Sequence, residues 1–127
     1  MGREMTLIEK AVKIGYPVLG DCCDAVLNDP QKIVRCYEMA ERFVPRADSR
    51  ISASGNPDLM EDFAEVCRYR LPHHMPVLRE AAERAKAGDT EYLLRERVEI
   101  QTSMAFMIGL ALALENNPVM MNLAGEA

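Results

Sequence analysis

Apolar residues recur along most of the chain at the three- and four-residue spacing that places them on one face of an α-helix. One such face, between residues 30 and 44, consists of Ile33, Tyr37, Ala40 and Val44. No stretch shows the apolar–polar alternation of a β-strand, and β-branched residues do not cluster. The pattern therefore predicts an all-α fold.

Capping residues, glycines and prolines divide this pattern into elements. Thr6 and Glu9 have the spacing of a capping box, which predicts a helix that begins there and ends at Gly15. The helices expected along the chain cover about 6–15, 21–27, 30–44, 57–71, 76–87 and 90–116. Asp29, Asn56 and Asp89 are the expected N-terminal caps of the helices that begin next to them. Residues 45–57 are rich in Gly, Ser, Asn, Asp and Pro and are predicted to form a loop, and Pro72–Pro76 a rigid joint.

The expected architecture is one domain, residues 1–127, built as a compact bundle of five to six helices with a long, largely buried C-terminal helix. A length of 127 residues suits a single domain, and 49% hydrophobic residues supply a core. The chain has nine Met and no Trp, so this core would consist mainly of Leu, Met, Ala, Val and Ile.

Net charge and hydropathy make nucleic acids and membranes less favoured as partners of this protein. The net charge of −5 works against non-specific binding to nucleic acid or to anionic membranes. The N-terminal residues MGREMTLIEK contain no apolar run, so we expect a cytoplasmic protein with reduced thiols. The longest uncharged stretch, Ile100–Leu114, is shorter than the roughly 20 residues of a membrane span and predicts a core helix instead.

Thiols and imidazoles are the first candidate for chemistry. The set is Cys22, Cys23, Cys36, Cys67, His73 and His74. Zinc sites use spacings such as C-x₂₋₄-C. Here Cys22 is adjacent to Cys23 and His73 to His74, and adjacent side chains point about 100° apart on a helix. One member of each pair could still converge with the remaining thiols, which gives Cys23, Cys36, Cys67 and His74 as a possible metal or redox site. Buried structural thiols are the simpler interpretation, and no cofactor is expected.

Catalytic motifs are missing from the sequence. There is no G-x-S-x-G, Walker loop, G-x-G-x-x-G or H-E-x-x-H. A dyad of Cys67 and His74 has a spacing of two helical turns, but Pro72 interrupts it. Catalysis is therefore not the expected activity, although an active site can be assembled in space without a motif.

Arginines beside the predicted loop and the predicted joint form a candidate anion-binding set: Arg46, Arg50, Arg68 and Arg70. Together with Tyr69 they suggest recognition of RNA or single-stranded DNA through residues 68–79. Neighbouring carboxylates dilute this positive charge, and Arg68 and Arg70 also suit the carbonyl end of a helix. Nucleic acid is therefore the weakest of the three functional alternatives.

Small residues recur every fourth position in the C-terminal helix, at Ala105, Gly109 and Ala113. Such a row makes a groove in which a second helix packs closely. The predicted interface consists of Met104, Ala105, Ile108, Gly109, Ala113, Met120 and Met121. We predict that the partner helix belongs to a second copy, in a two-fold homodimer. The alternative is a helix of the same chain, with the C-terminal helix at the centre of a monomer. The leading functional hypothesis is a non-catalytic module that binds another protein, and the thiol or metal sensor is its main alternative.

Overall fold

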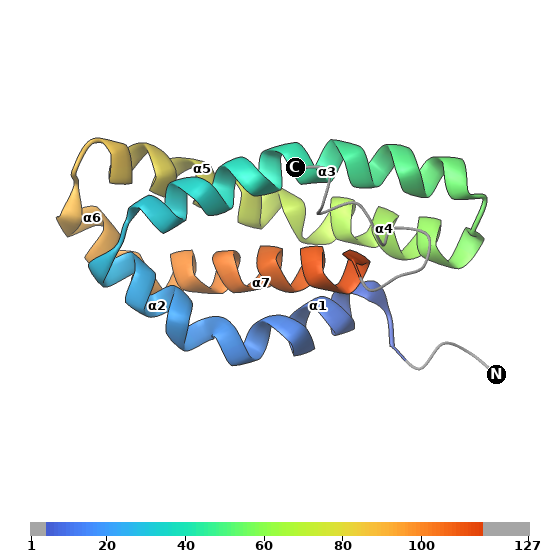
Figure 1. Ribbon diagram of the computed structural model, residues 1–127, viewed down its shortest axis with the longest axis horizontal. Coiled ribbons are helices and arrows are strands. Elements are labelled where there is room, and N and C mark those ends of the chain that lie inside the picture. Colours follow the sequence, from blue (N-terminus) through green and yellow to red (C-terminus); the bar gives the residue numbers. More distant parts are fainter. Residues whose placement is uncertain (1–4, 116–127) are drawn as a thin grey trace.

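The computed structural model describes residues 5–115, and the prediction of an all-α bundle is confirmed (Figure 1). No strand occurs among these residues. The elements are α1 (Leu7–Gly15), the 3₁₀ turn η1 (Tyr16–Val18), α2 (Leu19–Asn28), α3 (Gln31–Ser54), α4 (Pro57–Tyr69), α5 (Leu71–Lys86), α6 (Thr90–Arg95) and α7 (Arg97–Glu115).

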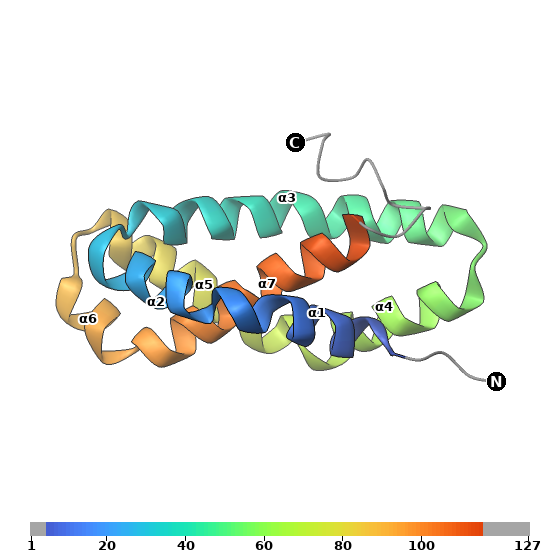
Figure 2. The same cartoon turned by 60° about the horizontal axis from the view of Figure 1, so that its bottom comes forward.

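The C-terminal helix α7 lies at the centre of the bundle. It contacts α1, α2, α3, α5 and α6, with α3 on one side and α1 and α2 on the other (Figures 1 and 2). Its fully buried side chains include Ile100, Met107, Leu110 and Leu114. Because α7 is apolar around most of its circumference, burial from several sides at once is what makes it stable in this fold.

The backbones of α1 and α7 touch at two glycines. A Cβ on Gly109 would overlap the carbonyl oxygen of Ala11 and lie 2.8 Å from the nitrogen of Gly15. A Cβ on Gly15 would overlap the carbonyl group of Ala105 in the same way. The separation of two helix axes depends on the side chains between them, so only glycine at both positions allows this approach. The groove of small residues on α7 is therefore filled by α1 of the same chain.

Helix α3 continues through Pro45, so the predicted loop over residues 45–57 is wrong. Phe43, Ala47 and Ile51 are spaced by four residues and all are buried, which extends the apolar face past the proline. Proline in a helix interior costs about 3 kcal/mol, but here burial of the following turns outweighs that cost. The turn itself is confined to Gly55, whose φ of 68° favours glycine, and Asn56, whose side chain caps α4 at Leu59 N (3.2 Å).

The prolines near residue 74 also lie inside a helix. Helix α5 begins at Leu71, with Pro72 in its first turn, where no backbone donor is needed, and Pro76 further along. The predicted joint at Pro72–Pro76 is therefore wrong. The predicted helix 90–116 is divided at Glu96 into α6 and α7.

The predicted N-terminal caps have mixed outcomes. The capping box of Thr6 and Glu9 is present, and the carboxylate of Asp89 accepts from the nitrogen of Tyr92 (3.1 Å). No side chain caps α3, and the carboxylate of Asp29 instead lies 3.9 Å from the guanidinium of Arg35.

Candidate functional site

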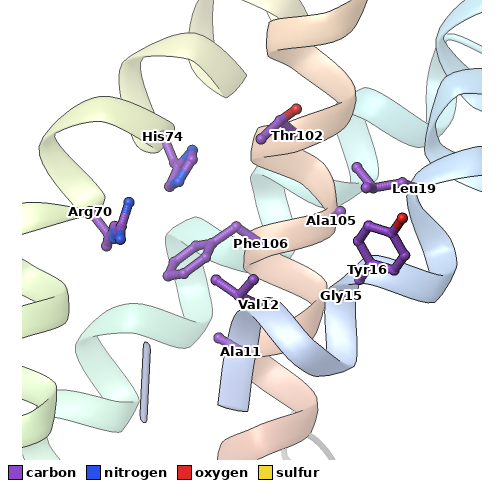
Figure 3. A pocket seen from close by; sticks show the side chains of 10 residues that line it. All are labelled: Ala11, Val12, Gly15, Tyr16, Leu19, Arg70, His74, Thr102, Ala105 and Phe106. Carbon is purple, nitrogen blue, oxygen red and sulfur yellow. The ribbon is translucent and has the colours of Figure 1, made fainter. Parts of the chain in front are cut away.

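A cleft opens to solvent where α1, α5 and α7 meet, and we call it the α1–α5–α7 cleft (Figure 3). Its volume is about 160 Å³. Ala11, Gly15 and Ala105 are among the residues that line it, and their small size leaves space that larger side chains would fill. The other lining residues are Val12, Tyr16, Leu19, Arg70, His74, Thr102 and Phe106. Most of this wall is apolar, which suits the recognition of an apolar group.

His74 is the buried polar group of the cleft. The residue is only 6% exposed, its Nδ1 lies 2.8 Å from the Oγ of Ser103, and its ring stacks on that of Phe106 with centroids 4.7 Å apart. Burial, together with the neighbouring His73 and Arg70, lowers the pKa of His74 to about 4. The imidazole is therefore neutral at pH 7 and is held in one orientation from both sides.

The pair of Ser103 and His74 has the residue types of a hydrolytic nucleophile and base, but its geometry favours a structural role. Ser103 is fully buried, so a substrate cannot reach its hydroxyl. A general base at neutral pH needs a pKa near 7, well above the value of about 4 for this imidazole. The serine instead fixes the ring of His74 at the edge of the cleft, an arrangement suited to binding.

The rim of the cleft exposes apolar side chains to solvent. Tyr16 is 72% exposed and Val12 is 51% exposed. Val98 is also exposed and lies one helical turn before Thr102, on the face of α7 that borders the cleft. Large apolar side chains that lie together on a surface often mark an interaction site.

Cys22 and Cys36 of the predicted thiol and metal set are neighbours, whereas the other members come from separate helices. Cys22 and Cys36 are buried, Cys23 is half-buried and Cys67 is exposed on α4. Residues 5–115 contain no group of three or more potential ligands that could hold a metal ion. Burial, together with the neighbouring Cys22, raises the pKa of the Cys36 thiol to about 12. His74, the fourth candidate, is already bonded to Ser103.

The predicted anion-binding arginines lie on two helices, α3 and α4, and at the C-terminal end of α4. Arg46 and Arg50 are half-buried on α3, and the guanidinium of Arg68 lies 5.6 Å from the ring centroid of Tyr69. Of the four, only Arg70, at the junction of α4 and α5, lines the cleft.

The described residues of the predicted interface pack against other helices of the same chain. Met104, Ala105, Gly109 and Ala113 are buried, Ile108 is half-buried, and Met120 and Met121 lie outside the described residues. A second copy could enter this groove only by displacing α1. Self-association therefore stays a prediction, and it needs a surface other than the groove.

Sequence reasoning missed the cleft itself. Its main polar contact joins residues 29 positions apart, His74 and Ser103, and no local pattern links them. A signal for the α1–α7 contact was available, because Ala11 and Gly15 repeat on α1 the small-residue spacing of Ala105 and Gly109 on α7.

Helix α7 is long and apolar enough to cross a membrane by length and composition alone. Over half of this apolar stretch, 56%, is buried against the rest of the protein, as in the core helix of a soluble bundle. Length and composition do not by themselves define a membrane-spanning helix.

Comparisons with known proteins identify no protein that is similar to this chain. No protein-family model matches the chain, and searches of curated proteins and of solved structures give no match. The fold places the chain in the broad class of all-α bundles. Because one fold can serve many functions, the cleft is the feature that bears on the function of this chain.

Proposed function

We propose that this protein is a non-catalytic binding module that recognises another protein through the α1–α5–α7 cleft. The observation that carries the proposal is an open apolar cleft bordered by exposed Tyr16 and Val12. A small molecule confined to the cleft would leave most of the Tyr16 ring in water, whereas a protein surface would cover it. Aromatic side chains at such positions commonly supply much of the binding energy of an interface.

The walls of the cleft are suited to binding without rearrangement. The backbone contact at Gly15 and Gly109 fixes α1 on α7, and Ser103 and Phe106 fix the ring of His74. A preformed site loses little conformational entropy when it is occupied. Burial of one medium-sized apolar side chain of the partner contributes about 1.5–3 kcal/mol, so the exposed rim has to add further contacts for a stable complex.

Site-specific photo-cross-linking tests this proposal. A photoreactive amino acid replaces Tyr16 in one variant and Lys86 in the control, which is exposed and lies twelve residues beyond His74, about 18 Å along α5. In the native cell, we expect a cross-linked species of defined mass from position 16 and not from position 86.

The captured protein is then purified and its affinity measured directly. We expect Tyr16→Ala to weaken binding at least about tenfold, which corresponds to about 1.4 kcal/mol, and Lys86→Ala to leave it unchanged. Equal cross-linking from both positions, or an unchanged Kd for Tyr16→Ala, would contradict the proposal. Because Tyr16 is exposed, we expect its replacement to leave the core intact, and circular dichroism of the variant checks this.

A further inference from the structure

The hydrogen-bonding atoms of the cleft indicate which chemical groups the bound partner segment presents to it. This inference rests on the proposed function. Within residues 5–115, His74 Nδ1 is the hydrogen-bond partner that the structure gives to the hydroxyl of Ser103. A buried hydroxyl that donated to no acceptor would be costly, so Ser103 donates to Nδ1. The imidazole proton then resides on Nε2, which remains as a donor for a ligand.

A second donor lies at the same end of the cleft. Arg70 lines the cleft, and its charge is close enough to His74 to lower the pKa of the imidazole. Within the described part of the chain, none of the ion pairs involves Arg70, whereas His73 contacts the carboxylate of Glu99 at 3.2 Å. The cleft therefore presents one neutral and one positively charged donor beside an apolar wall.

The volume of the cleft sets the size of the apolar group. An apolar cavity of about 150 Å³ holds benzene, and this cleft measures about 160 Å³. A phenylalanine ring or a leucine side chain fits this space against Phe106 and Leu19. The exposed rim at Tyr16 and Val12 extends beyond a single side chain and favours a continuous peptide segment over a free small carboxylate.

We infer that the occupant is an acidic segment of the partner protein, which places one phenylalanine- or leucine-sized side chain in the cleft and an adjacent carboxylate between Arg70 and Nε2 of His74. A carboxylate matches both donors, because it accepts a hydrogen bond from the imidazole and pairs with the guanidinium. Charge complementarity of this kind mainly supplies specificity.

Selection of peptides from a random seven-residue display library tests the inference even while the partner is unidentified. The matched targets are the wild type and Thr102→Phe, in which an exposed residue of the cleft becomes large enough to fill it. We expect peptides enriched on the wild type, and not on Thr102→Phe, to carry Phe or Leu next to Asp or Glu. Synthetic versions of the best peptide, with its carboxylate kept or changed to the amide, then give dissociation constants.

Arg70→Gln separates the charge from the apolar contact. We expect this variant to bind the acidic peptide about fivefold more weakly and its amide counterpart less than about twofold more weakly. The affinity for the acidic peptide should also depend less on salt concentration. Cleft-dependent peptides without acidic residues, or an acidic peptide unaffected by Arg70→Gln, would overturn the inference and leave the proposed function standing. A wild-type dimer that Thr102→Phe dissociates would place a second copy in the cleft and also overturn the inference. Failure of the Tyr16 cross-linking experiment would instead contradict the proposed function.

Discussion

Gly109→Ala is the sharpest test of the packing that creates the cleft. The added Cβ would overlap the carbonyl oxygen of Ala11 and lie 2.8 Å from the nitrogen of Gly15 and 3.0 Å from the carbonyl carbon of Ala11. All three atoms belong to the backbone of α1, so no rotamer change relieves the overlap. Since contacts between heavy atoms are optimal near 3.5–4.0 Å, α1 has to move away from α7 by at least about 1 Å.

Two opposing terms set the size of the effect. Overpacking a core by one methyl group costs about 1–3 kcal/mol, and a clash with a rigid backbone belongs in the upper part of that range. Alanine improves the helix propensity of α7 by about 1 kcal/mol over glycine. We therefore expect Gly109→Ala to lower the free energy of unfolding by about 1–2 kcal/mol.

Gly20→Ala is the matched control. Gly20 lies within α2, and no heavy atom comes within 4 Å of a Cβ built there, so only the propensity term acts. We expect this variant to gain about 0.5–1 kcal/mol. The free energies of unfolding of the two alanine variants should therefore differ by about 1.5–3 kcal/mol, which is resolved by urea unfolding monitored by circular dichroism.

The same pair of variants distinguishes packing within the chain from packing between copies. If Gly109→Ala were as stable as Gly20→Ala, α1 would not lie on α7 as described. If the wild type proved dimeric by light scattering, and Gly109→Ala weakened the dimer while stabilising the monomer, the groove would belong to an interface between chains.

Other residues give three independent tests. His74 should lower the free energy of unfolding by about 2 kcal/mol between pH 7 and pH 5, because its pKa is about 4 in the folded state and near 6.5 in the unfolded state, which therefore binds more protons as the pH falls. In His74→Phe, urea unfolding should show a smaller fall of stability with pH, and an unchanged fall would refute the assignment to His74. Pro45→Ala should raise the midpoint of thermal unfolding, since it restores a helical donor to Glu41 within α3, whereas a lower midpoint would indicate a break in the helix at this position. A disulfide reagent should modify exposed Cys67 first and buried Cys36 only on unfolding, as followed by mass spectrometry of the labelled peptides, and early labelling of Cys36 would contradict its burial.

The helical elements and most of their ends are local properties, and the sequence predicted them. Spacing of apolar residues identified the helical faces, and the caps of Thr6, Asn56 and Asp89 marked three starts because each uses a side chain within three residues of its target. Local rules failed where packing overrides propensity. Pro45 and Pro76 are typical of helix breaks, but burial of Ile51 and Leu78 keeps both segments helical.

The candidate site depended on the tertiary structure. The sequence showed that α7 carries a groove at Gly109, but the choice between α1 and a second copy depends on which helix packs there in the folded protein. The pairing of His74 with Ser103 likewise depends on how α5 packs on α7, since the two residues are 29 positions apart. Periodicity and capping report interactions within a few residues, whereas the cleft is made by backbone approach and burial between helices far apart in sequence, so only the folded chain decides it.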